Sequence, residues 1–302
     1  MHCRWVVARP LARTVGCPHR RRRFSSTFQF ENDTAVRTTG ASGIYQSVNP
    51  LSDQWSIGDA PNGGMLIAMG INAMRDALVE TTHRDPLTLT AHFLGKSKPG
   101  ENVDIPVEVI KRGRSYSTVR ASLNQSGVQR ISLLATFGDL DSQSGPSFVK
   151  ARDPLDLPPL SECPVNLCER ANSFGTLPQR IALHVPQNAP FLKKFARGKS
   201  GGEPLLEGYG SLVDGCPTSL RAVALFTDCF PPALLNSVET RWVPTIELTV
   251  HFYSRPTTAD GVVQVRFFNE YLQNGLSSTN GEVFDRSGKL LALSRQLCTV
   301  IG

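Results

Sequence analysis

Two stretches of the 302-residue sequence nearly repeat one another and decide the fold: Pro86-Leu-Thr-Leu-Thr-Ala-His92-Phe93 and Pro244-Thr-Ile-Glu-Leu-Thr-Val-His251-Phe252. In each, apolar residues alternate with polar ones, as in a β-strand with one buried face. The predicted buried sets are Leu87, Leu89, Ala91 and Phe93 in the first stretch, and Ile246, Leu248, Val250 and Phe252 in the second. Because the same strand occurs in each half of the chain, we predict a tandem repeat.

The sequence around both stretches extends the repeat. Three strand-like segments follow each one, at about 102–112, 115–126 and 129–138 in the first half and at 262–273, 277–286 and 290–300 in the second. One helix precedes each stretch: an almost wholly apolar one over 62–78, and one over 218–230 that Pro231 and Pro232 stop. Ser126-Gly127 and Ser287-Gly288 suit tight turns between strands. The prediction is an α+β fold of two antiparallel sheets, each with one buried helix.

The N-terminal stretch differs in composition from the rest. Residues 1–30 contain seven arginines and no acidic residue, so subtracting these charges from the net +6 leaves −1 for the remainder. Arg-rich, acid-free composition ending in Ser25-Ser26-Thr27 is typical of a mitochondrial transit peptide, and residues 1–25 are predicted to be one, with a matrix location. The nearly neutral remainder argues against a nucleic-acid partner. No apolar run approaches the ~20 residues that a membrane span requires.

The predicted organisation is an N-terminal unit over 30–140, a proline-rich linker over 141–170 and a C-terminal unit over 171–302. Five cysteines follow residue 30, an odd number without C-x-x-C spacing, so reduced thiols are expected and no metal site is predicted. Residues 198–202 match G-x-S-x-G, but flanking Lys, Arg, Glu and Pro predict a solvated loop instead of a nucleophile elbow. His92 and His251 should face away from the apolar side of their strands.

The helix-plus-sheet repeat and its local motifs resemble the acyl-CoA thioesterase II type of double-hotdog protein, over about residues 30 to 302. The motifs that support the resemblance are Ala60-Pro-Asn-Gly-Gly64, His92-Phe-Leu, Pro99-Gly100, Arg112-Gly-Arg-Ser-Tyr-Ser117, Leu134-Ala-Thr-Phe-Gly138, Thr227-Asp-Cys-Phe-Pro-Pro232, Pro244-Thr-Ile-Glu247 and Ser294-Arg-Gln296. The resemblance implies a tandem double hotdog, with each sheet wrapped around a central helix. It also implies hydrolysis of acyl-CoA to a free fatty acid and CoA, a reaction of lipid metabolism, without metal or organic cofactor.

The resemblance further implies that an acidic side chain, a hydroxyl and an amide hold the catalytic water, and Asp228, Thr245 and Gln296 match these positions. The residue types suit this role. A carboxylate can accept a proton from water that attacks the thioester carbonyl, and hydroxyl and amide groups can orient that water. Backbone N–H groups at a helix N-terminus suit the developing oxyanion, so Asn62, Gly63 and Gly64 are candidate substrate-binding or oxyanion residues.

The repeat also predicts which half lacks this chemistry. Aligning the helices from Ala68 onto Ala224 places Asn72 opposite Asp228. Near Thr245 the first half offers Pro86 or Leu87, and near Gln296 it offers Thr136 or Phe137. Since an asparagine is a poor base, we predict one active site per chain.

Two alternatives stay open. A hotdog hydratase or dehydratase acting on acyl-CoA is less favoured, because that chemistry usually uses a histidine with a carboxylate and neither predicted helix contains histidine. A catalytically silent acyl-binding or scaffold protein is the second. Acyl-CoA is the expected partner, and assembly into a homo-oligomer is left open.

Overall fold

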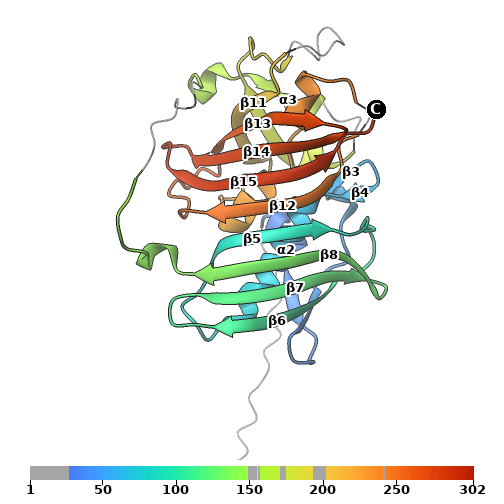
Figure 1. Ribbon diagram of the computed structural model, residues 1–302, viewed down its shortest axis with the longest axis vertical. Coiled ribbons are helices and arrows are strands. Elements are labelled where there is room, and N and C mark those ends of the chain that lie inside the picture. Colours follow the sequence, from blue (N-terminus) through green and yellow to red (C-terminus); the bar gives the residue numbers. More distant parts are fainter. Residues whose placement is uncertain (1–26, 149–154, 156, 171–174, 193–201, 241) are drawn as a thin grey trace, which may run out of the picture.

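The computed structural model describes residues 27–148, 155, 157–170, 175–192, 202–240 and 242–302. The predicted transit peptide at 1–25 lies outside these residues, as do most of the G-x-S-x-G match at 198–202 and part of the predicted linker. In the described part of the chain, a large antiparallel sheet faces the viewer in Figure 1 and the long helix α2 lies behind it.

Thirteen strands of the described chain form one sheet in the order β1-β2-β6-β7-β8-β5-β12-β15-β14-β13-β11-β10-β9. The strands of the first half are β1 (Val36–Thr38), β2 (Ile44–Ser47), β5 (Asp85–Phe93), β6 (Asp104–Arg112), β7 (Ser117–Gln125) and β8 (Val128–Gly138). Those of the second half are β9 (Val165–Asn166), β10 (Ile181–Val185), β11 (Leu205–Leu212), β12 (Thr245–Phe252), β13 (Val263–Gln273), β14 (Leu276–Asp285) and β15 (Leu290–Thr299). A separate small ribbon pairs β3 (Ser56–Ile57) with β4 (Ala60–Pro61).

The prediction of two separate sheets is corrected, because the two halves join edge to edge. The two repeated stretches, β5 and β12, pair antiparallel, with Thr90 directly opposite Thr249 and a 3.0 Å hydrogen bond between their hydroxyl groups. In Figure 1 these strands lie side by side at the centre of the sheet, with the first half below and the second above. Pairing satisfies backbone groups that two free sheet edges would leave exposed.

Helix α2 (Gly63–Ala77) matches the first predicted helix closely and is buried along nearly its whole length, as its apolar sequence predicts. Helix α5 (Leu220–Phe226) is shorter than the predicted 218–230. It ends early because the Thr227 hydroxyl donates to the Ala224 carbonyl at 2.8 Å, and the following N–H, of Asp228, closes a tight turn onto the Leu225 carbonyl. The two helices pack against one another. The short helix α1 (Gln29–Asp33) is joined to α5 by the ion pair of Glu31 with Arg221, and α3 (Leu167–Arg170) packs against β10.

Two β-bulges change the predicted alternation of the repeated strands. The register of β5 shifts between Pro86 and Thr88, and that of β12 between Thr245 and Glu247. A bulge adds one residue, so the side chains before it change face. Ile246, predicted to be buried, is 38% exposed as a result. Beyond the bulges the alternation is confirmed, with Leu89, Ala91, Leu248 and Val250 buried and both His92 and His251 exposed.

Most other local predictions agree with the structure. Ser126 and Gly127 both adopt positive φ angles in a two-residue turn between β7 and β8. The five cysteines of the described chain are free and buried. Residues 165–170 of the predicted linker belong to the second half, because β9 pairs with β10. No helix among the described residues is long and apolar enough to cross a membrane.

Candidate active site

Asp228 lies just past the end of α5, where the shortened helix leaves its side chain directed at the first half of the chain. Its Oδ2 accepts a 2.8 Å hydrogen bond from the backbone N–H of Gly64, in the first turn of α2. The side-chain amide of Asn62 donates to the Asp228 backbone carbonyl at 3.0 Å and to Oδ2 at 3.3 Å. Residues 164 or more positions apart in sequence therefore hold one carboxylate from two sides.

Gln296 connects this carboxylate to the sheet. Its Nε2 donates to Asp228 Oδ1 at 2.9 Å and also to the hydroxyl of Thr245. Gln296 lies on β15. Thr245 is the first residue of the neighbouring strand β12, and it pairs with Cys298 of β15. The three predicted residues thus form one hydrogen-bonded group at the boundary between helices and sheet.

The bulge in β12 is what brings Thr245 to this group. Thr245 stands three residues before Leu248, and residues an odd number apart point to opposite faces of a regular strand. The register shift between Thr245 and Glu247 reverses that relation, so Thr245 shares the helix-facing side with Leu248 and Gln296. The sequence motif located the residue, but the alternation used to predict the strand would have placed its side chain on the wrong face.

The electrostatic state of Asp228 suits a base. Burial among protein atoms raises the pKa of its carboxyl to about 7, and the hydrogen bonds from Gly64, Asn62 and Gln296 limit the rise. These donors are uncharged, and Asp228 forms no ion pair with another described residue. The residue as a whole is half-buried. Burial also raises the pKa of the neighbouring Cys229 thiol well above its usual range, so this cysteine stays protonated.

Asn62, Gly63 and Gly64 lie beside Asp228, as is expected of site residues. Asn62 and Gly64 donate hydrogen bonds directly to the Asp228 carboxylate. The Oδ1 of Asn62 caps α2 by accepting from the Met65 N–H at 3.1 Å, which turns its amide toward Asp228. Gly63 and Gly64 have no side chains because none fits. A Cβ on Gly63 would lie 2.4 Å from the Phe93 ring, and one on Gly64 would lie 2.9 Å from the Leu225 carbonyl. Their sequence signal was the Asn-Gly-Gly at the helix start, but its contact with Asp228 was not predicted.

The first half lacks equivalents of these groups. Pro86 stands in the place of Thr245, one residue before the bulge in each strand. Ala135 stands in the place of Gln296, because each pairs with the leucine two residues after the bulge. The predicted counterparts, Thr136 or Phe137, are therefore wrong by at least one position. Neither Pro86 nor Ala135 has a polar side chain.

Asn72, the residue that the helix alignment places opposite Asp228, has a structural hydrogen bond instead. It is buried, and its Nδ2 donates to the backbone carbonyl of Thr34 at 2.8 Å. Among the residues that the structure describes, the group of carboxylate, amide and hydroxyl therefore occurs in the second half alone. No group of three or more His, Cys, Asp or Glu side chains suited to a metal occurs in the same residues.

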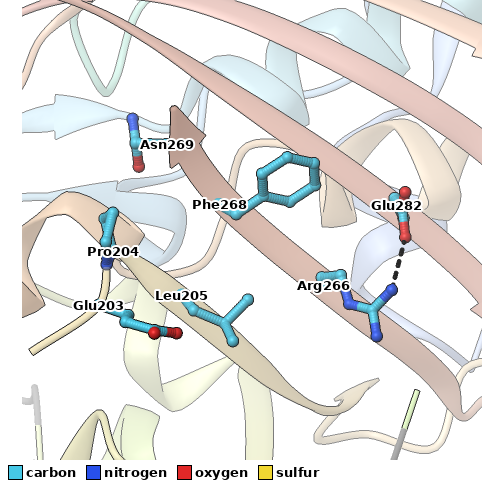
Figure 2. A pocket seen from close by; sticks show the side chains of 7 residues that line it. All are labelled: Glu203, Pro204, Leu205, Arg266, Phe268, Asn269 and Glu282. Carbon is cyan, nitrogen blue, oxygen red and sulfur yellow. Dashed lines mark hydrogen bonds and ion pairs between the residues drawn. The ribbon is translucent and has the colours of Figure 1, made fainter. Parts of the chain in front are cut away.

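A cavity of about 340 Å³ lies elsewhere, between β11, β13 and β14. Figure 2 shows its lining, in which Leu205 and Phe268 lie to the left of an ion pair between Arg266 and Glu282 with a 3.2 Å separation. None of the predicted site residues lines this cavity. It is separate from the candidate active site.

The buried helix against an antiparallel sheet, duplicated along the chain, defines a hotdog-fold protein, and comparisons identify its family. The N-terminal domain of acyl-CoA thioesterases matches residues 51–138, and the C-terminal domain matches residues 161–300. The chain belongs to the acyl-CoA thioesterase family and is a thioester hydrolase.

Individual relatives and solved structures resemble the chain to different degrees. An uncharacterized protein of Mycobacterium tuberculosis is 27% identical over 267 residues, covering 83% of this chain and 89% of the relative. The crystal structure of a putative thioesterase II from Thermobifida fusca superposes with a TM-score of 0.77 at 27% identity, over 90% of this chain and 97% of that one. The dehydratase domain of RzxB from Pseudomonas fluorescens shares the fold at 13% identity, with a TM-score of 0.54 over 84% of this chain and 93% of that one. The fold alone therefore does not separate hydrolysis from dehydration.

Proposed function

We propose that the protein hydrolyses acyl-CoA thioesters to a free fatty acid and CoA, with a water molecule activated by Asp228 and oriented through Gln296 and Thr245. The observation that most supports this proposal is the position of the Gln296 amide, which bonds both the Asp228 carboxylate and the Thr245 hydroxyl. A base and a polar group that are tied together can fix one water molecule between them.

The hydrogen bonds at the carboxylate indicate where that water would bind. A carboxylate offers about four acceptor positions. The Oδ2 atom accepts hydrogen bonds from Gly64 and Asn62. The Oδ1 atom accepts one hydrogen bond from Gln296, which leaves one acceptor position on that oxygen. A water molecule that donates to Oδ1 would therefore lie on the side of Gln296 and Thr245. The proposed water site follows from the remaining acceptor capacity.

In the proposed reaction, the water oxygen attacks the thioester carbonyl carbon while its proton passes to Asp228. The tetrahedral intermediate then collapses, the carbon–sulfur bond breaks, and the CoA thiolate leaves with the electron pair. The proton on Asp228 returns to the thiolate or to solvent, which restores the base. A pKa of about 7 suits this cycle, because the group can both take and release a proton near neutral pH.

The negative charge that develops on the carbonyl oxygen needs hydrogen-bond donors. We propose that the N-terminus of α2, at Asn62, Gly63 and Gly64, supplies them, because a helix N-terminus has a partial positive charge. The Asn62 N–H is occupied by the Trp55 carbonyl at 2.8 Å, so the N–H groups of Gly63 and Gly64 are the candidate donors. The Gly64 N–H already bonds Asp228. As the proton moves to Asp228, that bond weakens, and this helix end becomes better able to stabilise the oxyanion.

The test is release of free thiol from a panel of short- to long-chain acyl-CoAs by the purified full chain, with Asp228→Asn as the comparison. Loss of thiol release in the variant, with the fold intact, supports the proposal. Equal rates in the two proteins would remove Asp228 from the mechanism. Hydration of an enoyl-CoA without thiol release would favour a hydratase, and acyl-CoA binding without either reaction would favour a silent binding protein.

We also infer that each half is a hotdog unit and that the pair mimics a hotdog dimer within one chain. The antiparallel pairing of β5 with β12 through Thr90 and Thr249 supports this arrangement, because it relates the two halves by an approximate two-fold axis. The active site then lies between the units, since Gly64 of the first holds Asp228 of the second.

A mitochondrial matrix location remains a proposal that rests on the arginine-rich residues 1–25. The relatives named above include bacterial proteins and lend it no support. Fusing residues 1–30 to a fluorescent protein in a eukaryotic cell tests it. Import and cleavage of the fusion would support the proposal, and diffuse fluorescence would overturn it.

A further inference from the structure

A second cavity lies where the approximate two-fold axis repeats the active site. Its volume is about 280 Å³, at the small end for a ligand pocket. Pro86, the counterpart of Thr245, forms part of its wall. So do the first residues of α5 and Ile71 of α2. Asn72, the counterpart of Asp228, bonds a side chain of the wall, because Arg75 donates to its Oδ1 at 3.4 Å.

This cavity differs from the active site in its charge. Four arginines line it together with a single carboxylate, Asp85, and we call it the arginine pocket; the four are Arg75, Arg84, Arg221 and Arg255. A site that has lost its base and gained guanidinium groups no longer suits hydrolysis. It suits an anion instead.

Two of the arginines are neutralised within the protein. Arg221 donates to both carboxylate oxygens of Glu31, at 2.7 and 2.9 Å. Arg255 pairs with Asp85 at 2.8 Å and also with Asp139 and Asp141. These pairs explain why four positive charges can gather in one place.

Arg75 and Arg84 differ from Arg221 and Arg255. In the described part of the chain, neither forms an ion pair with a carboxylate. Arg84 donates to the backbone carbonyls of Thr81 and Val79, and a guanidinium has five N–H donors, so several remain. Burial and the nearby charge of Arg221 lower the pKa of Arg75, while Asp76 and Glu31 partly oppose that effect. Asp76 and Glu31 therefore act on Arg75 without forming an ion pair with it among the described residues, and Asp76 acts in the same way on Arg84.

A further polar group in the wall lacks a partner. The hydroxyl oxygen of Thr218 is buried and has no hydrogen-bond partner among the described residues. A buried hydroxyl without a partner is destabilising. Because Thr218 lines the arginine pocket, we take its hydroxyl as a candidate ligand contact.

We propose that the arginine pocket binds a compact anionic group, either a phosphate or a carboxylate, without hydrolysing its bearer. Both chemistries belong to molecules of the proposed reaction, since CoA carries phosphates and the product carries a carboxylate. The proposal itself does not depend on hydrolysis at Asp228.

The test measures binding to the full chain by calorimetry with three probes: inorganic phosphate, adenosine 3′,5′-bisphosphate and octanoate. We expect saturable binding of at least one probe, retained in Asp228→Asn. We also expect Kd to rise at least about 10-fold in Arg75→Gln and in Arg84→Gln, because each loses charged hydrogen bonds to the ligand. Arg120→Gln is the matched control, since Arg120 pairs with Glu108 on the exposed face of the sheet and should leave Kd unchanged.

Thr218→Val separates a ligand contact from a structural one. Without ligand, the variant should be at least as stable as the wild type, because it removes a buried hydroxyl that has no partner. With ligand, its affinity should fall. Binding of the two phosphate-bearing probes but not of octanoate would identify a phosphate site. Binding of octanoate alone would identify a carboxylate site. The proposal is overturned if no probe saturates, or if binding survives Arg75→Gln and is lost in Asp228→Asn.

Discussion

The backbone N–H of Gly64 bonds the Oδ2 of Asp228 at 2.8 Å, across the boundary between the two halves of the chain. The contact is close because neither Gly63 nor Gly64 has a side chain, which lets the start of α2 approach the end of α5. Only a substitution by proline would remove this backbone donor, but other substitutions can displace it. The position of the base therefore depends on the packing of the two helices.

We predict that Gly64→Ala destabilises the protein and lowers its activity. The new methyl group would lie 2.9 Å from the Leu225 carbonyl oxygen and 3.0 Å from its Cα, and backbone atoms cannot move aside cheaply. Overpacking of this kind costs about 1–3 kcal/mol, which chemical denaturation can measure. Gly95→Ala is the control, because its nearest neighbour would be an arginine side chain at an ordinary 3.5 Å. Equal stabilities of the two variants would contradict the proposed tight helix contact.

Asp228→Asn should lower kcat by about 10²- to 10⁴-fold, the usual contribution of a general base. The fold should survive, because the amide oxygen can still accept from Gly64 and the Gln296 side chain can turn its own oxygen toward the new NH₂ group. Thiol release under saturating acyl-CoA measures the effect, and circular dichroism checks the fold. A well-folded variant with wild-type kcat would show that another group activates the water.

The pH dependence should distinguish Gln296 from Thr245. With Asp228 ionising at a pKa of about 7, kcat/KM should rise with pH and level off above that value. Gln296→Met removes a hydrogen bond that lowers this pKa, so the midpoint should move to higher pH. Thr245→Val removes no bond to Asp228, so it should lower the rate and leave the midpoint in place. A midpoint shift in both variants, or in neither, would contradict these separate roles.

The sequence alone was sufficient to predict the repeat, most strands and the helix of the first half, because each depends on local periodicity. The two Thr-rich strands β5 and β12 were correctly recognised as equivalent, but their pairing with one another was not. Alternation shows which side chains of a strand are buried and contains no information about which edge meets which. The joining of the halves is a tertiary property.

The site residues divide in the same way. Asp228, Thr245 and Gln296 were found through motifs, whereas the geometry that unites them depends on two features that motifs do not encode. One is the bulge at Ile246, which turns Thr245 toward the helices. The other is the early end of α5 at Phe226, which frees Asp228 to meet the start of α2.

Stability should depend on pH in a direction opposite to that of an ordinary ion-paired carboxylate. The pKa of Asp228 is about 7 in the folded protein against an ordinary value of 3.8 for an aspartate, so the folded state binds more protons between these values. The contribution of this group to stability is therefore fully present below about pH 4 and is lost as pH rises toward 7. At about 1.4 kcal/mol for each pH unit, the loss is at most ~4 kcal/mol. Asp228→Asn should be the more stable protein at pH 8 and not at pH 4, as urea denaturation would measure. If the wild-type protein were more stable than Asp228→Asn at pH 8, the raised pKa would be contradicted.

Asn72→Ala provides the complementary experiment in the first half. The substitution leaves the buried Thr34 carbonyl without its 2.8 Å donor and opens a small cavity, so the free energy of unfolding should fall by about 1–3 kcal/mol. The kcat of the folded fraction should stay within about twofold of wild type, because Asn72 has no contact with Asp228, Thr245 or Gln296 in the structure. Asn72→Ala should lose stability, whereas Asp228→Asn should lose catalytic rate. Measuring the free energy of unfolding and kcat on the same preparations separates the two effects. Abolition of turnover by Asn72→Ala with an intact fold would mean that both halves take part in catalysis, and the single-site mechanism would be wrong.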